Sequence, residues 1–297
     1  MKRVSTTHLV KMKSLAEKIV MVTAYDYPTA CLVDEAGVDV VLVGDSLGMV
    51  VLGHNTTLPV TLDDMIHHAK AVVRGVKRAL VAVDMPFMTY QTGTGDALRN
   101  AGRILQETGA AAVKLEGGVD VCPQVRALAA AGIPVIGHLG LTPQSVNAFG
   151  GYKLQGRDEE SAQRILSDAQ ALEHSGAFSI VLECIPEDLA EKITATISIP
   201  TVGIGAGVHC DGQVLVLHDL LGIAGNVKPR FVKQYAQVGK VIREAVEEYS
   251  REVREAKFPG PEHSFPSEER PSEERGSSEE RGSEERSVPY STASNKS

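Results

Sequence analysis

Three carboxylates stand at the ends of short apolar runs in the first half of the chain. They are Asp45, Asp84 and Glu116. If these runs are neighbouring parallel strands, the acids converge, and converging acids must be protonated, paired with bases or bound to a cation. Oxygen ligands without a cysteine or a histidine pair favour a hard ion, so the pattern predicts a Mg²⁺ site. The alternative for Asp45 and Asp84 is a helix N-cap at a strand-to-helix turn.

Three further polar side chains stand at comparable positions. Lys114 lies two residues before Glu116, so both point to the same side of a strand, and a buried lysine needs an anionic partner. That partner is either a substrate carboxylate or the acids nearby. His138 could hydrogen-bond a ligand oxygen or cap the end of a strand. Glu183 follows a later run, apart from the three acids, and is a candidate general base, with a metal ligand or ion-pair acid as the alternative.

A divalent ion, a cation for a carboxylate and a separate base together suit a 2-oxo acid. The metal could chelate the carboxylate and keto oxygens of such a substrate. It would then stabilise the charge that develops when a neighbouring proton leaves. The residue types do not identify the electrophile that follows, which could be an aldehyde, a phosphoryl group or a one-carbon donor.

The elements that must position these residues form a repeating pattern. Eight short, mainly apolar runs rich in β-branched residues, without strict apolar–polar alternation, are typical of strands covered on both faces, as in a parallel sheet. They are Ile19–Thr23, Val38–Val43, Leu80–Val83, Ala111–Leu115, Ile133–Ile136, Phe178–Leu182, Ile199–Val202 and Val214–Leu217. Helical periodicity marks segments between them, including Leu62–Lys77, Asp96–Glu107 and Glu159–Ser175. Four glycines just before strands are expected to end helices in the left-handed conformation: Gly37, Gly109, Gly132 and Gly176.

This alternation predicts one (β/α)8 barrel over residues 1–257, with its site at the carboxyl ends of the strands. A doubly wound open sheet is the alternative fold. From residue 258 onward the composition changes, and SEER occurs four times between residues 267 and 286 with almost no apolar residue. We expect residues 258–297 to form a disordered acidic tail.

The overall composition narrows the classes of function. The 297 residues are 43% hydrophobic and 23% charged, which is ordinary for a globular protein. A net charge of -8 argues against a nucleic-acid or anionic-lipid partner. No apolar run approaches the roughly 18 residues that span a bilayer. Scattered cysteines and an N-terminus without an apolar signal segment predict a cytoplasmic protein that acts on small molecules.

Long words of the sequence resemble the ketopantoate hydroxymethyltransferase family. They are VTAYDYPTA (22–30), VGDSLGMVVLGHNTTLPVTLDDM (43–65), DMPFMTYQ (84–91), VKLEGG (113–118), GHLGLTPQS (137–145), GGYKLQGR (150–157), GIGAG (203–207), CDGQVLVLHDLLG (210–222) and PRFVKQY (229–235). The resemblance covers roughly residues 3–256, and the long second word is highly specific to that family.

The resemblance implies a (β/α)8 TIM barrel of the phosphoenolpyruvate/pyruvate superfamily type. It implies transfer of a hydroxymethyl group from 5,10-methylenetetrahydrofolate to 3-methyl-2-oxobutanoate, giving 2-dehydropantoate for pantothenate and coenzyme A synthesis. It also implies a cytoplasmic homo-oligomer, typically a decamer. The family's functional positions fall on Asp45, Asp84 and Glu116 for Mg²⁺, on Asp45, Ser46, Asp84 and Lys114 for substrate, and on Glu183 for the proton acceptor.

Two rival functions stay open. One is a Mg²⁺-dependent carbon–carbon lyase or phosphonomutase of the same superfamily, although the K-K-C-G-H loop of isocitrate lyases is absent from the sequence. The other is a catalytically silent metal-binding barrel. A silent barrel would be expected to lose Lys114 or Glu183, and both are present.

Overall fold

The chain folds around a closed barrel of eight parallel strands, hydrogen-bonded in chain order. The computed structural model describes residues 3–223 and 229–265, so the SEER repeats expected in the tail lie outside the described residues. The strands are β1 (Ile19–Thr23), β2 (Val40–Val43), β3 (Leu80–Asp84), β4 (Ala112–Glu116), β5 (Val135–Gly140), β6 (Ser179–Glu183), β7 (Thr201–Ile204) and β8 (Gly212–Leu215). The predicted (β/α)8 barrel is confirmed, and the open sheet is wrong.

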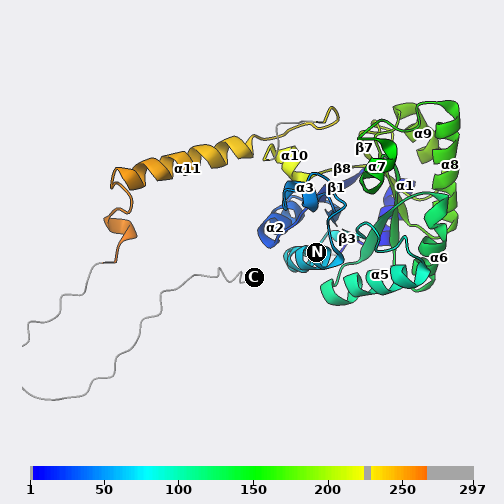
Figure 1. Cartoon of the computed structure of the whole chain (residues 1–297), viewed down its shortest axis with the longest axis horizontal. Helices are drawn as coiled ribbons and strands as arrows, with labels where there is room; N and C mark the ends of the chain where they lie inside the picture. Colours follow the sequence, from blue (N-terminus) through cyan, green and yellow to red (C-terminus); the bar gives the residue numbers. More distant parts are fainter. Residues whose placement is uncertain (1–2, 224–228, 266–297) are drawn as a thin grey trace, which may run out of the picture. The chain divides into compact units, whose positions relative to one another are not determined.

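Helices surround the strands, as Figure 1 shows for α5, α6, α8 and α9. The α-helices are α1 (Thr6–Ser14), α2 (Tyr27–Glu35), α3 (Leu47–Val50), α4 (Leu62–Gly75), α5 (Thr94–Thr108), α6 (Cys122–Ala130), α7 (Val146–Phe149), α8 (Glu159–His174), α9 (Glu187–Thr196), α10 (Leu217–Leu221) and α11 (Val238–Arg254). Short 3₁₀ turns are η1 (Val119–Val121), η2 (Pro143–Ser145) and η3 (Pro261–His263). Among the helices described, none has the length and apolar character to cross a membrane.

The observed boundaries follow local chemistry. The four glycines expected at helix ends all have positive φ, from +77° at Gly109 to +101° at Gly176. Strand β5 differs most from its expected range, starting two residues later and ending four residues later. Pro134 has no backbone N–H to donate, which fits a start at Val135. The strand then continues to Gly140 because β4 and β6 pair with it on either side.

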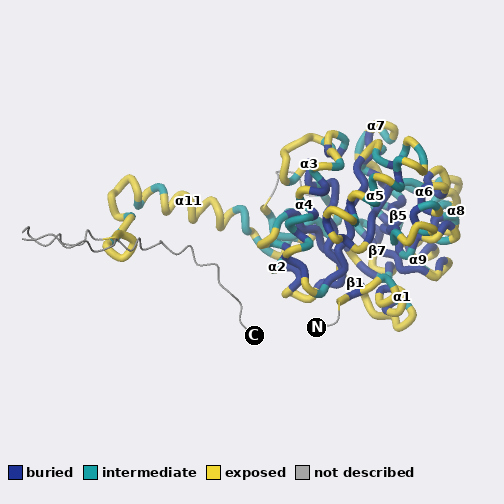
Figure 2. Tube along the Cα trace, turned by 90° about the horizontal axis from the view of Figure 1, so that it is seen from below, coloured by how far each residue is buried: buried dark blue, intermediate teal, exposed yellow. Residues whose placement is uncertain are grey.

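The core has two layers. Alternate strand residues face into the barrel, where Ile19, Leu42, Leu80 and Ile136 pack together with Val4, Leu9 and Met12 at the N-terminal side. The other alternate residues pack against the helices and make the larger cluster. Figure 2 shows the result, with buried strands inside and exposed residues along the outer faces of the helices.

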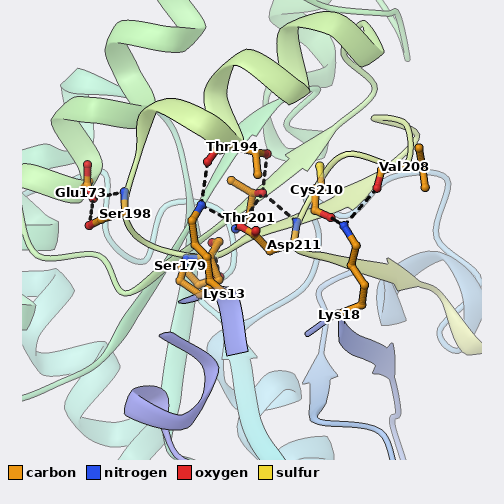
Figure 3. Close-up of polar contacts among 11 residues, drawn as sticks. Lys13, Lys18, Glu173, Ser179, Thr194, Ser198, Thr201, Val208, Cys210 and Asp211 are labelled. Atoms are coloured by element: carbon orange, nitrogen blue, oxygen red, sulfur yellow. Dashed lines mark hydrogen bonds and ion pairs between the residues drawn. The ribbon is translucent and has the colours of Figure 1, made fainter. Parts of the chain in front are cut away.

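Hydrogen bonds and an ion pair, drawn in Figure 3, connect helix α1 to the barrel. Lys13 of α1 donates from Nζ to Asp211 Oδ2 at 2.9 Å and to the carbonyl of Thr194 at 2.8 Å. Asp211 Oδ2 also accepts the backbone N–H of Thr201 at 2.9 Å. These contacts hold α1 against residues preceding β7 and β8, at the end opposite to the predicted site.

Helix α11 crosses the boundary between the two compact units, residues 1–244 and 245–297. Every residue of this helix is described and none is buried. Its large apolar residues recur at the spacing of one helical face. They are Val241, Ile242, Val246, Tyr249 and Val253, all exposed.

Candidate active site

Asp84, Lys114, Glu116 and His138 share the inward face of the barrel at the carboxyl ends of β3, β4 and β5. Strand side chains alternate between two faces, so Asp84 continues the inward row of Leu80 and Ala82 in β3. The register pairs Asp84 with Lys114 and Glu116 with His138 across neighbouring strands. Lys114 and Glu116 therefore share one side of β4, as the spacing predicts. His138 lies within β5 and does not cap its end.

Asp45 and Ser46 follow β2 and lead into α3. The N-cap position of α3 is Ser46, whose side chain makes no capping bond, and the N-cap position of α5 is Gly93. Neither Asp45 nor Asp84 caps a helix, so the alternative of a simple N-cap is not supported. Instead Asp84 Oδ2 accepts the backbone N–H of Asp45 at 3.0 Å, which ties the two turns together.

Lys114 forms a buried ion pair with Asp84. Its Nζ lies 2.9 Å from Asp84 Oδ1, with 5% and 4% of the two side chains exposed. Burial lowers the pKa of the lysine, but the charges of Asp84 and Glu116 outweigh it and raise the pKa. The lysine is therefore charged at neutral pH. The ion pair between Lys114 and a nearby acid, one of the two alternatives for this lysine, is therefore present. Lys114 also lines the cleft, so it can still contact a substrate anion.

The acids perturb one another because they are buried together. Burial, followed by the charges of Asp84 and Glu116, raises the pKa of Asp45 well above its usual range. Burial also raises the pKa of Asp84, although Lys114 opposes it. Burial acts in the same direction on Glu116, but His138, the Lys114 charge and the backbone N–H of Gln144 together outweigh it and lower the pKa. Asp45 is the acid whose negative charge is least compensated.

His138 links the acid cluster to Glu183. Its Nε2 lies 3.1 Å from Glu183 Oε2, and its Nδ1 lies 3.4 Å from Glu116 Oε1 and 3.1 Å from Lys114 Nζ. Burial and the Lys114 charge lower the pKa of the imidazole, but the two carboxylates outweigh them and raise it to about 9. From the sequence, Glu183 is expected to lie apart from the three acids. In the structure, the imidazole of His138 lies between Glu183 and Glu116 and contacts both.

The donor set fits a divalent cation. Glu116 Oε1 is buried and makes no hydrogen bond in the described part of the chain, although His138 Nδ1 lies 3.4 Å away. Four carboxylates face one lysine and one histidine, and the raised pKa values of Asp45 and Asp84 show that ionising all four acids together is unfavourable without a further cation. Uncompensated buried charge is costly, and hard oxygen donors suit Mg²⁺.

A cleft of about 1330 Å³ opens over this layer. Single small ligands usually occupy roughly 300–1000 Å³, so the cleft has room for more than one substrate. The acids, Lys114 and His138 form its floor, and Met49, Tyr152, Leu154 and Phe231 contribute to its walls. Glu183 also lines the cleft, and its side chain is 15% exposed against 3% for Glu116. A substrate can therefore reach Glu183 more easily than the deeper acids.

Three polar residues at the site were not identified from the sequence. Tyr25 meets Ser46 Oγ at 2.9 Å through its hydroxyl, which positions that serine. Gln144 contacts Asp45 and Glu116, and Tyr90 contacts Gln144. All three stand in the sequence words quoted above, a few residues beyond strand ends. Their position just after strands could have marked them as site residues. Tyrosine and glutamine, however, do not by themselves indicate a catalytic or metal-binding role.

Comparison with known families gives one consistent result. The profile of the ketopantoate hydroxymethyltransferase family matches residues 3–261. The 3-methyl-2-oxobutanoate hydroxymethyltransferase of Carboxydothermus hydrogenoformans is 59% identical over 265 residues, covering 89% of this chain and 96% of that protein. The enzyme of the same name from Clostridium kluyveri is 60% identical over 256 residues, covering 86% and 91%.

Solved structures support the fold. Phosphonopyruvate hydrolase in complex with oxalate and Mg²⁺ superposes with a TM-score of 0.57 at 12% identity, covering 89% of this chain and 93% of that one. The 2,3-dimethylmalate lyase, a member of the PEP mutase/isocitrate lyase superfamily, gives 0.55 at 18% identity, covering 88% and 93%. At such identities the likeness establishes a shared barrel fold.

Proposed function

Because the chain belongs to the ketopantoate hydroxymethyltransferase family, we propose that its barrel binds Mg²⁺ and 3-methyl-2-oxobutanoate together and that Glu183 removes the C3 proton. Hydroxymethyl transfer in the pantothenate pathway is the activity of the family. The observation that carries the mechanism is the buried layer of acids beside Lys114, with Glu183 nearest the solvent.

The proposed metal ligands are Asp45, Asp84 and Glu116. No three His, Cys, Asp or Glu side chains of the described residues are already spaced around one ion. Asp45 and Asp84 would hold the ion, with Glu116 contributing directly or through water, since Mg²⁺ usually keeps several waters. When bound, Mg²⁺ would supply charge stabilisation to the oxo acid as its C3 proton leaves.

The substrate carboxylate is proposed to lie between Lys114 and Ser46. The lysine is charged, and burial strengthens its attraction for an anion. The Ser46 hydroxyl is held at 2.9 Å by Tyr25, so it is oriented before substrate arrives. His138 is proposed to hydrogen-bond a substrate oxygen through Nε2, the nitrogen that faces Glu183 and makes no hydrogen bond within the described residues. These contacts would fix C3 of the oxo acid toward the cleft wall that bears Glu183.

Glu183 is the proposed general base. His138 Nε2 engages Glu183 Oε2 at 3.1 Å, which leaves Oε1 for the proton. The C3–H bond breaks, its electrons pass into the enolate, and C3 then attacks the methylene carbon carried by the folate. Overall, oxo acid, 5,10-methylenetetrahydrofolate and one water give 2-dehydropantoate and tetrahydrofolate. The volume of the cleft beyond the oxo-acid site supports a folate co-substrate.

The experiment that tests this function is a turnover assay. Tetrahydrofolate release is measured with 3-methyl-2-oxobutanoate and 5,10-methylenetetrahydrofolate, with Mg²⁺ or with chelator. We expect turnover with Mg²⁺ and its loss with chelator. Turnover that persists after complete removal of divalent ions would contradict the metal-dependent mechanism. No turnover under any metal would favour a silent barrel, and cleavage of a carbon–carbon or carbon–phosphorus bond would favour the lyase or mutase.

The assembly and location are also proposals. We propose a cytoplasmic homo-oligomer, a decamer by family resemblance, and the exposed apolar face of α11 supports association with further copies of the chain. Light scattering of the purified protein measures the mass of the assembly directly. A monomer at micromolar concentration would contradict the proposal. Cell fractionation tests the location.

A further inference from the structure

We propose that Gln144 is a positioning residue, which holds Asp45 and Glu116 in the orientation that binds Mg²⁺. This inference rests on the proposed function, because it presupposes a metal at the acid cluster. Gln144 lies in η2, the turn that follows β5, and only 6% of the residue is exposed. Its side chain and its backbone each contact a different carboxylate of the cluster.

The side-chain amide of Gln144 uses all of its hydrogen-bonding capacity. Its Nε2 donates to Asp45 Oδ2 at 2.9 Å and to the carbonyl oxygen of Met85 at 3.0 Å. Its Oε1 accepts from Tyr90 Oη at 2.9 Å and from Gln91 Nε2 at 3.2 Å. An amide has two protons and two acceptor sites, so no capacity is left over. The orientation of the amide is therefore fixed from four sides.

The same residue restrains a second acid through its backbone. The N–H of Gln144 donates to Glu116 Oε2 at 2.9 Å. Gln144 thus donates a hydrogen bond to Oδ2 of Asp45 and another to Oε2 of Glu116. Asp45 follows β2, and Glu116 ends β4. Glu116 Oε1 makes no hydrogen bond within the described residues; it faces His138 Nδ1 at 3.4 Å and is the oxygen that Gln144 leaves for a cation. Gln144 thereby decides which oxygen of each carboxylate is presented.

The direction of the amide is fixed by the groups around it. The ring of Tyr90 is fully buried, its hydroxyl accepts the backbone N–H of Glu116 at 3.0 Å, and its one proton is shared between Gln144 Oε1 at 2.9 Å and the carbonyl of Glu116 at 3.0 Å. A flipped amide would place Oε1 against Asp45 Oδ2 and the Met85 carbonyl, two acceptors. The network therefore permits one orientation only. Groups of this kind orient ligands without touching the metal.

A purely structural role is the competing explanation, and Gln124 provides the matched control. Gln124 is also a buried glutamine, 8% exposed, and its Nε2 donates to the carbonyl of Tyr90 at 3.3 Å. Within the described part of the chain, its amide makes no hydrogen bond to a carboxylate. Gln144→Met and Gln124→Met remove the same buried amide and keep similar length, but only the first removes a donor from the acid cluster.

The experiment measures Mg²⁺ binding to the metal-free full-length protein by titration calorimetry, with the fold of each variant checked by circular dichroism. We expect Gln144→Met to bind Mg²⁺ about 10- to 100-fold more weakly than wild type, the usual range for outer-shell partners. Gln124→Met is expected to bind as wild type does, even where its thermal stability falls. Tyr90→Phe, which keeps the ring and removes one of the four hydrogen bonds of the amide, is expected to weaken binding by a smaller factor.

Three results would overturn the inference. Wild-type affinity in a folded Gln144→Met refutes it directly. Equal weakening in Gln144→Met and Gln124→Met shows a general effect of core damage. If Gln144→Met does not fold, Tyr90→Phe decides, and unchanged affinity in that variant contradicts the inference. Failure of the wild type itself to bind Mg²⁺ instead removes the proposed metal site, and with it the role of Gln144.

Discussion

Replacing Lys114 by methionine should destabilise the metal-free protein strongly. Lys114 Nζ and Asp84 Oδ1 lie 2.9 Å apart with 5% and 4% of their side chains exposed, so solvent cannot take over the pairing. Breaking a buried pair by removing one partner costs about 3–5 kcal/mol. Since 1 kcal/mol shifts the melting temperature of a domain of this size by about 2–4 °C, we expect a drop of roughly 6–20 °C.

Magnesium should recover part of that loss, because a bound cation would neutralise the carboxylates that the lysine leaves behind. Lys13→Met is the matched control. Lys13 Nζ also lies 2.9 Å from a carboxylate, Asp211 Oδ2, with 16% of each side chain exposed, but at the opposite end of the barrel. Lys13→Met should lower the melting temperature by less than Lys114→Met does, because the Lys13 ion pair is less buried. Mg²⁺ should stabilise Lys13→Met by no more than it stabilises wild type.

Thermal unfolding followed by circular dichroism, in EDTA and in Mg²⁺ at neutral pH, measures both effects. The reasoning is refuted when metal-free Lys114→Met melts within 2 °C or so of wild type, a shift of less than about 1 kcal/mol. It is equally refuted when Mg²⁺ raises the melting temperatures of the two variants by the same amount.

Two further predictions concern stability. Asp34→Ala should lower the free energy of unfolding by at least about 1.5 kcal/mol at pH 7, because the carboxylate accepts the N–H groups of residues 77–79. Burial raises the pKa of Asp34, but these bonds outweigh it and lower the pKa, so its contribution is present above about pH 4 and lost as pH falls through the lowered pKa. In urea titrations the difference from wild type should shrink below pH 4, and a constant difference would contradict this. Gly140→Ala should cost more stability and more turnover than Gly132→Ala: both glycines have positive φ, +91° and +79°, but only at residue 140 would a Cβ meet Glu183 O, at 2.2 Å. Similar melting temperatures and rates would count against a constraint on Glu183.

The barrel could be predicted from the sequence because burial on both faces leaves a strong signal. The run Ile19–Thr23 is apolar at its first four positions, and β1 has those bounds. The C-terminal polar residues of the runs then follow the alternation of the strand, which places Asp84 and Glu116 inward with no further information. The site residues on strands were therefore predictable as a group.

The contacts made by loops were not predictable in the same way. Gln144 reaches Asp45 across 99 positions of sequence, and no local pattern specifies such a contact. The link from Glu116 to Glu183 through His138 depends on β5 extending to Gly140, beyond its apolar run. Polar residues inside a strand end the apolar signal, so the sequence underestimates strand length where the chemistry lies.

Isotope exchange tests the central claim most directly. Loss of the C3 proton from 3-methyl-2-oxobutanoate in D₂O, without folate, is followed by NMR for wild type and Glu183→Gln, and Mg²⁺ binding to both is measured by calorimetry. We expect Mg²⁺-dependent exchange in wild type, and its loss in Glu183→Gln while Mg²⁺ still binds. Undiminished exchange in the variant would contradict Glu183 as the base, and exchange in wild type that ignores Mg²⁺ would contradict the metal-stabilised enolate.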